Sequence, residues 1–135
     1  MPRLSVWMIR TALLHLGLGF TLGALILYHK GLPFWPGAWR LLPLHVELVL
    51  FGWTLQLALG VAFWILPRYA REPVRGREGL PWLAYGLLNL GALTVGLAGW
   101  LAAPPALALV GRAAELLAAF AFAAHLWPRV KPLGA

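Results

Sequence analysis

The chain has 135 residues, of which 61% are hydrophobic and 11% are charged, and its mean hydropathy is +0.79. A soluble domain of this length could not hide so much apolar surface, so the composition predicts a protein of the lipid bilayer. Its formal net charge is +7 and it contains no cysteine. The lack of cysteine excludes disulfides, thiolate ligands and cysteine nucleophiles.

Four apolar segments predict membrane spans at residues 9–28, 44–66, 80–100 and 106–127. Each has about the 20 residues that a helix needs to cross a hydrocarbon core. The first segment is too long for a signal peptide and lacks a small-residue cleavage site. The predicted fold is therefore all-α, an integral membrane four-helix bundle that occupies residues 1–135 as one domain.

The three breaks between these spans differ in chemistry. Residues 29–43 contain prolines, glycines and aromatic side chains suited to the headgroup layer. Residues 67–79 are rich in arginine and predict a solvated loop. The last break, 102–105, is so short that the third and fourth spans should form a tight antiparallel hairpin.

Lysine and arginine predict the orientation. One side of a four-span protein would carry Arg3, Arg10, Arg68, Arg71, Arg75, Arg77, Arg129 and Lys131, and the other side only Lys30 and Arg40. The positive-inside rule then places both termini in the cytoplasm, in the inner membrane of a prokaryote. Anionic lipid is the expected partner of the basic residues, and their layout beside lipid-length spans argues against a nucleic-acid partner.

The second span contains the most informative polar residues. Ionisable and polar groups in lipid are costly unless they have partners, so they mark sites. A stripe at helical spacing joins His45, Val49, Gly52, Gln56, Gly60 and Phe63. The glycines leave room for something flat or bulky, so we interpret His45, Gly52 and Gln56 as candidate cofactor-binding residues.

Glu47 belongs to a second stripe with Phe51, Thr54 and Ala58, about 200° around the helix from His45. His45 and Glu47 are candidate metal ligands, because imidazole suits copper, zinc and iron and a carboxylate can complete such a shell. From one regular helix they cannot bind the same ion. They either have different neighbours or join a site assembled between subunits.

Other polar residues allow both structural and functional interpretations. Arg112 and Glu115 are three residues apart in the fourth span and are expected to pair on one helix face, further into the membrane than Glu47. His15 and His125 fall toward the cytoplasmic end. Any of these residues could simply bond a neighbouring helix. His29 is expected in a solvated loop.

One run of residues resembles a known family. The sequence His45-Val46-Glu47-Leu48, then Phe51-Gly52-Trp53, Gly60 and Pro67-Arg68, is similar to the histidine-bearing helices of the catalytic subunit of haem-copper oxidases and nitric oxide reductases. That subunit has twelve helices in three arcs of four. The resemblance implies that this chain is a single arc, that it assembles as a homotrimer, and that His45 binds copper or haem b.

The resemblance also limits the expected chemistry. Where the family has a second histidine, this chain has Glu47, and its third span has no histidine pair. We therefore expect no complete oxidase activity from the chain alone, although an oxidoreductase-like role fits. The function predicted is a small haem-copper-oxidase-like membrane protein for electron transfer or metal handling, with a possible electron-transfer partner.

Three alternatives remain open at this point. A four-helix di-haem cytochrome would use His15 with His125 as an inner pair of ligands. A small proton-coupled four-span transporter would depend on Glu115 or Glu47. An accessory subunit would need no cofactor.

Overall fold

A computed structural model of the chain describes residues 1–71 and 73–131 and is all-α. Its helices are α1 (Arg3–Gly31), α2 (Leu42–Glu47), α3 (Gln56–Ile65), α4 (Gly79–Trp100) and α5 (Pro105–Leu126). A 3₁₀ turn, η1 (Ala38–Leu41), precedes α2, and a π-helical segment, η2 (Leu48–Leu55), joins α2 to α3. A final 3₁₀ turn, η3 (Trp127–Arg129), follows α5.

These elements make four helices that are long and apolar enough to cross a membrane, as predicted: Arg3–Gly31, Ala38–Ile65, Gly79–Trp100 and Pro105–Arg129. The first two are longer than expected. Helical structure in the second span begins with η1 at Ala38, and Pro43 is the second residue of α2, at a helix start where its missing N–H group is tolerated. It ends at Ile65, because the residue before Pro67 is extended.

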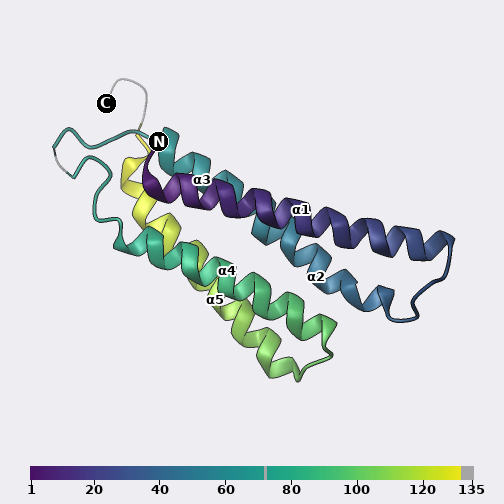
Figure 1. Cartoon of the computed structure of the whole chain (residues 1–135). Coiled ribbons are helices and arrows are strands. Elements are labelled where there is room, and N and C mark those ends of the chain that lie inside the picture. The colour runs from purple at the N-terminus through teal and green to yellow at the C-terminus, as the bar shows by residue number, and fades with distance from the viewer. Residues whose placement is uncertain (72, 132–135) are drawn as a thin grey trace.

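The helices are arranged as two antiparallel pairs (Figure 1). The helix α1 lies along α2, η2 and α3, while α4 packs on α2 and also on α5. The start of α1, the end of η3 and the α3–α4 loop lie at one end of the molecule. At the other end the α4–α5 pair diverges from α1 (Figure 1), while α4 stays packed on α2, so the molecule is an open arrangement and not a closed bundle.

The main apolar core lies in the half of the molecule that carries the termini. It is built from all four spans, by Leu4, Met8, Phe63, Ala84, Leu88, Ala118, Phe122 and Leu126. Elsewhere the helices bury little. In the most apolar window of each span, only 22% to 39% of residues are buried within the chain. Most of the helix surface is therefore available to lipid or to other chains.

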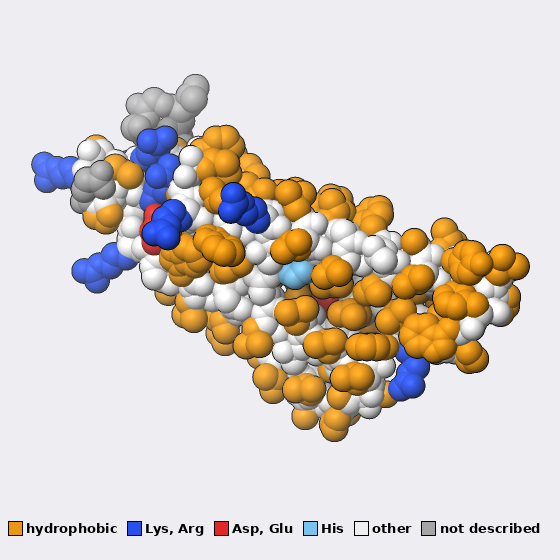
Figure 2. All heavy atoms as spheres, viewed as in Figure 1, with side chains coloured by type: hydrophobic (Ala, Val, Ile, Leu, Met, Phe, Trp, Pro, Cys, Tyr) orange, Lys and Arg blue, Asp and Glu red, His pale blue; other side chains and the backbone are white. Residues whose placement is uncertain are grey.

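The basic side chains are concentrated at one end of the molecule. Figure 2 shows lysine and arginine side chains gathered at the end where the termini lie, and hydrophobic side chains covering the middle. The N-terminus, the arginine-rich loop and the C-terminus thus share one end, as the charge pattern predicted. A multi-pass membrane protein with this layout has one strongly basic face toward the membrane surface.

The α4–α5 hairpin is as tight as the four-residue break predicted, with α4 ending at Trp100 and α5 beginning at Pro105. Ala102 makes the turn with a φ of 52°. Two glycines then let the helices approach closely. A Cβ atom on Gly91 would lie 2.8 Å from the carbonyl oxygen of Gly111, and one on Gly111 would lie 3.0 Å from that of Gly91. Backbone atoms cannot move aside as flexible side chains can.

This contact gives a testable expectation for folding. Gly91→Leu should lower the free energy of unfolding in detergent by about 1–3 kcal/mol, because the added side chain forces the two backbones apart. The matched control is Gly86→Leu on the same helix, where a Cβ atom would meet nothing within 4 Å. It should change stability by less than about 0.5 kcal/mol. Equal thermal unfolding of the two variants would contradict this account of the hairpin.

Candidate functional site

Three charged side chains meet inside the membrane-spanning part of the molecule, and we call them the ion cluster: Glu47, Arg112 and Glu115. The guanidinium of Arg112 donates to both carboxylate oxygens of Glu47, at 3.2 Å to Oε2 and 2.5 Å to Oε1. It also donates to Oε2 of Glu115 at 2.7 Å. The guanidinium carbon lies 5.2 Å from the ring centre of Phe51. The cluster therefore joins the second and fourth spans.

The depth of the cluster differs from the sequence-based expectation. The predicted pair of Arg112 and Glu115 is confirmed, but the expectation that it lies deeper than Glu47 is wrong. Helices rise about 1.5 Å per residue, so Glu47 is about 14 Å from Ala38 and Glu115 about 15 Å from Pro105. The spans start at the same end of the molecule, so the two carboxyl groups lie at one level.

Glycines of α4 make room for this meeting. A Cβ atom on Gly96 would lie 3.4 Å from Cβ of Glu47, and one on Gly91 would lie 2.6 Å from Cγ of Glu115. The helix α4, which packs on both α2 and α5, thus has little side-chain volume where the side chains of Glu47 and Glu115 pass it. Longer residues at these positions would push the acidic side chains away from α4.

His45 faces the opposite side, toward α1. Its Nδ1 lies 2.7 Å from the carbonyl oxygen of Gly19. A carbonyl can only accept, so Nδ1 carries the proton and donates it, which leaves the lone pair on Nε2 free in the neutral ring. The imidazole lies against Gly23, where a Cβ atom would be 2.7 Å from Cε1 of His45. In the Gly19-x-x-x-Gly23 pair, Gly19 therefore accepts the hydrogen bond from His45 and Gly23 leaves room for its ring.

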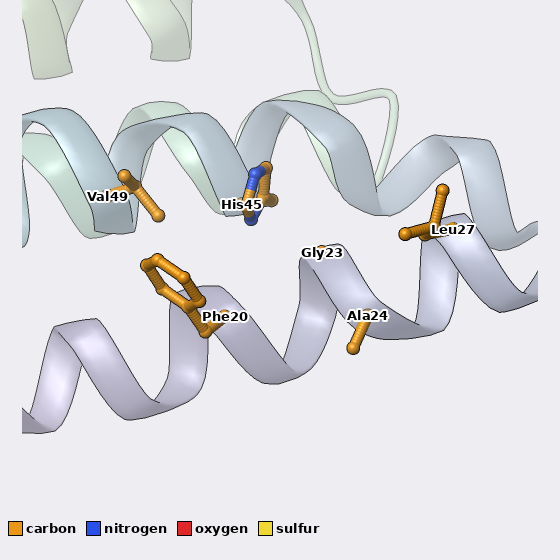
Figure 3. A pocket seen from close by; sticks show the side chains of 6 residues that line it. All are labelled: Phe20, Gly23, Ala24, Leu27, His45 and Val49. Atoms are coloured by element: carbon orange, nitrogen blue, oxygen red, sulfur yellow. The ribbon is translucent and has the colours of Figure 1, made fainter.

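A hollow of about 460 Å³ lies beside His45, between α1 and α2. Besides the imidazole, residues of α1 and Val49 of η2 line it, the α1 residues being Phe20, Gly23, Ala24 and Leu27 (Figure 3). Figure 3 shows His45 on the α2 side facing Gly23, with Phe20 and Leu27 to either side along α1. Its volume falls within the range usual for small-molecule and cofactor sites.

The rest of the glycine stripe has protein partners. A Cβ atom on Gly52 would collide with the His15 ring, and one on Gly60 would lie 2.9 Å from Cβ of Met8. Gln56 is fully buried, donates to the carbonyl oxygen of Met8 at 3.2 Å and accepts from Asn89 at 2.7 Å. The glycines of the stripe thus face α1, Gln56 bonds both α1 and α4, and at Gly52 and Gln56 these helices fill the room in which a cofactor was expected.

His45 and Glu47 therefore have different neighbours within one chain, which is one of the two arrangements expected from their positions. His45 contacts α1 and Glu47 contacts Arg112 of α5. Across residues 1–71 and 73–131, no group of three or more histidine or acidic side chains is placed to hold a metal ion. Their joint assignment as metal ligands remains a prediction for an assembly of more than one chain.

The regular stripe of Glu47, Phe51, Thr54 and Ala58 does not stay on one side. Glu47 and Phe51 contact Arg112, whereas Thr54 and Ala58 are exposed. The cause is η2, whose wider turns change the angle between successive residues. The hydroxyl of Thr54 follows this geometry and donates to the carbonyl oxygen of Val49, five residues earlier, at 2.9 Å.

The remaining histidines lie apart from both sites. His15 is buried beside Gly52, and its Nδ1 has no hydrogen-bond partner among the described residues. His125 stacks on Phe63 with ring centres 5.6 Å apart. His29 was expected to be a solvated loop residue, but its Nδ1 accepts the backbone N–H groups of Phe34 and Trp35 at 3.2 and 3.3 Å. It therefore shapes the α1–η1 connection.

Sequence reasoning missed Arg129, which it grouped with the lipid-facing basic residues. In the structure Arg129 is buried and only 1% exposed. Its guanidinium donates to the carbonyl oxygens of Phe63, Leu66 and Pro67 at 2.9 to 3.0 Å, and so caps the carboxyl end of α3. Last-turn carbonyls lack helical partners, which is the signal that could have predicted a capping cation here.

Comparison of the chain with protein-family models, with curated proteins and with solved structures found no match. The geometry around His45 and in the ion cluster is therefore the basis for assigning a function.

Proposed function

We propose that this chain is a membrane electron-transfer protein that binds haem through Nε2 of His45. The observation that supports the proposal is the hydrogen bond from Nδ1 to the Gly19 carbonyl. Metal-bound histidines usually donate their other ring N–H to a carbonyl or carboxylate, which fixes the tautomer and orients the ring. The adjacent apolar hollow offers volume for a bulky group.

Haem suits His45 better than copper does. A single imidazole is enough for an axial haem ligand, while a copper site draws on several ligands. The residues present fit the group, since His45 supplies the ligand and Phe20, Leu27 and Val49 supply apolar walls. Bound haem would provide one-electron chemistry. Copper remains the second candidate for a site to which other chains contribute.

A homotrimer would complete the site. The hollow beside His45 lies on the outside of the α1–α2 pair, so another subunit could close it. The open arrangement of helices leaves faces free for other subunits, and the resemblance of the His45 segment to haem-copper oxidases implied a trimer of single arcs. We expect light scattering of the purified protein in detergent to give a mass of three chains. A monomer at every protein concentration would contradict this part of the proposal.

Membrane orientation belongs to the same proposal. The protein would lie in the inner membrane of a prokaryotic cell with its basic end facing the cytoplasm. Both termini would then be cytoplasmic, and His45 would lie toward the outer side of the membrane. A reporter enzyme that functions in the cytoplasm should then be active when fused to either terminus, and a reporter that functions only after export should be inactive there. Activity of an exported reporter at either terminus would contradict this topology.

The decisive experiment is the absorption spectrum of the purified protein after reconstitution with haem. We expect the wild-type protein to show a Soret band and to bind about one haem per chain, at His45. His45→Gln should lose the Soret band, because glutamine is a poor haem ligand. Glutamine can still donate a hydrogen bond to the Gly19 carbonyl, so the variant keeps that contact. His29→Gln is the matched control and should keep the band.

The His45→Gln variant separates a ligand from a structural histidine. A purely structural role requires only the hydrogen bond to Gly19, so the variant would then behave as the wild type does. Unchanged haem content in a folded His45→Gln protein, or no haem in the wild type, would overturn the proposal. Thermal unfolding in the same detergent shows whether each variant is folded.

A further inference from the structure

Two arginines meet at the basic end of the molecule, and we call them the arginine pair: Arg75 and Arg129. Arg75 belongs to the α3–α4 loop, and Arg129 is the last residue of the fourth span. The positive charge of Arg75 lies close enough to act on Arg129. Arg129 is only 1% exposed, and Arg75 is partly buried. Two like charges repel each other more strongly when water is excluded from around them.

Nothing in the described part of the chain neutralises this pair. No carboxylate of residues 1–71 or 73–131 forms an ion pair with either arginine. The three backbone carbonyls that accept from Arg129 carry no formal charge, and Glu78 acts on the neighbouring His125. The phenol of Tyr69, which also lies near Arg129, is uncharged at neutral pH. Glu72 lies outside the described residues and is tested by a variant of its own.

Three side-chain nitrogens at this place are buried without a hydrogen-bond partner among the described residues: Nη1 of Arg129, Nε of Arg75 and Nε2 of His125. His125 stacks on Phe63, and the guanidinium of Arg129 lies over the same ring. The backbone of Arg75 lies beside the His125 ring. Buried polar groups without partners are uncommon in folded proteins, and a bound ion is one explanation for them. Two of these groups are permanently cationic donors, so the ion that fits is an anion with acceptor oxygens.

The level of the arginine pair in the membrane indicates which anion it meets. Arg129 donates to the carbonyl oxygens of Leu66 and Pro67, so the pair lies where the second and fourth spans end. Membrane spans end at the headgroup layer, where the phosphates of anionic lipids are concentrated. Guanidinium groups bind phosphate through parallel N–H···O hydrogen bonds, which makes arginine well suited to this group.

We propose that the arginine pair is a binding site for the phosphate group of an anionic lipid such as phosphatidylglycerol. The site is separate from His45 and goes beyond the haem-binding function proposed above. Nη1 of Arg129 and Nε of Arg75 are the donors left for the phosphate oxygens. Because Arg75 is only partly buried, its side chain can turn and admit the headgroup. The negative charge of the lipid then offsets the repulsion between the two arginines.

Native mass spectrometry of the delipidated protein in detergent measures this binding directly. The wild type should retain phosphatidylglycerol more tightly than phosphatidylcholine, whose phosphate is neutralised by its own ammonium group. Arg75→Gln should weaken the binding of phosphatidylglycerol by about tenfold, because a charged hydrogen bond is lost. Arg77→Gln is the matched control, since it removes the same charge from an exposed position of the same loop. It should change the affinity by less than about twofold.

Equal affinities of the Arg75→Gln and Arg77→Gln proteins would show a diffuse attraction of basic residues for anionic lipid and would overturn the proposal. A wild type without preference for phosphatidylglycerol over phosphatidylcholine would do the same. The test uses Arg75 because replacing Arg129 also removes the cap of α3.

Thermal unfolding separates a lipid-binding arginine from a structural one. Phosphatidylglycerol should raise the unfolding temperature of the wild type but not that of Arg75→Gln, because a ligand stabilises the protein that binds it. In detergent without lipid, Arg75→Gln should be at least as stable as the wild type, since the change removes the repulsion from Arg129. A lipid-free variant that is clearly less stable than the wild type would assign Arg75 a structural contact and overturn the proposal.

Two further measurements identify the source of the negative charge. An excess of inorganic phosphate should not displace phosphatidylglycerol from the wild type; displacement would overturn the assignment to a lipid in favour of a soluble phosphate. Glu72→Gln should bind phosphatidylglycerol as the wild type does. Binding that appears only in Glu72→Gln would make Glu72 the partner of the arginine pair and overturn the proposal.

Discussion

Replacing Arg112 with methionine should destabilise the folded protein by about 3–5 kcal/mol, because a buried carboxylate is left without its partner, although the guanidinium itself is 47% exposed. The guanidinium is the hydrogen-bond donor to both Glu47 and Glu115. Without it, two nearly buried carboxyl groups at one membrane depth would have lost their shared partner. Methionine retains much of the side-chain volume, so the loss would reflect charge and not packing.

The measurement is the free energy of unfolding in detergent, compared with that of a triple variant. Arg112→Met combined with Glu47→Gln and Glu115→Gln removes every formal charge of the cluster, and it should recover most of the lost stability. Arg77→Met, an exposed change in the α3–α4 loop, is the control and should have little effect. A triple variant no more stable than Arg112→Met would refute this explanation.

Acid should reduce the effect of the single Arg112→Met change. Lowering the pH protonates the two stranded carboxyl groups, which removes the charge that the variant leaves without a partner. The difference in stability between wild type and variant should therefore be smaller at acidic pH than at neutral pH. A difference that grows on acidification would contradict the charge argument.

Removing the Arg129 side chain should be the second most damaging change, costing about 2–4 kcal/mol from lost charged hydrogen bonds and lost packing. Its three backbone acceptors lie at the carboxyl end of α3, and its guanidinium also lies 5.1 Å from the ring centre of Phe63. This one side chain therefore ties the end of the fourth span to the end of the second.

Thermal unfolding in detergent would measure the effect of Arg129→Ala. The control is Lys131→Ala, two residues away and exposed, which removes the same charge without removing a cap. We expect Arg129→Lys to lie between the wild type and Arg129→Ala, since lysine keeps the charge but not the planar fork of donors. Equal stability of the Arg129→Ala and Lys131→Ala proteins would show that the capping contacts contribute nothing.

The sequence by itself determined the four helices, the tight α4–α5 hairpin and the shared basic end. These depend on local properties: long apolar runs, prolines and glycines at the breaks, and arginines in the loops. The pairing of Arg112 with Glu115 was also predictable, because residues three apart meet on any α-helix. The angle of about 200° between His45 and Glu47 excluded a shared ion on one regular helix and left two arrangements open, and within one chain the two residues contact different neighbours.

The identity of those neighbours was only partly within reach of sequence reasoning. Apart from Arg10 at the start of the first span, the charged residues within the predicted spans are Glu47, Arg112 and Glu115, and charges in lipid need partners. That rule alone suggests one cluster. It was missed because the second helix was expected to begin at Leu44, which placed Glu47 too near the surface, whereas helical structure begins at Ala38.

Only the tertiary structure decided how the second span meets its neighbours. It seats His45 on Gly23, fills the space at Gly52 with His15, and turns Arg129 inward to cap α3. Each contact joins residues far apart in the chain, and its outcome depends on how closely two backbones approach and on the wider turns of η2. Helical periodicity specifies which face a residue occupies, but the packing of the other helices determines what that face contacts.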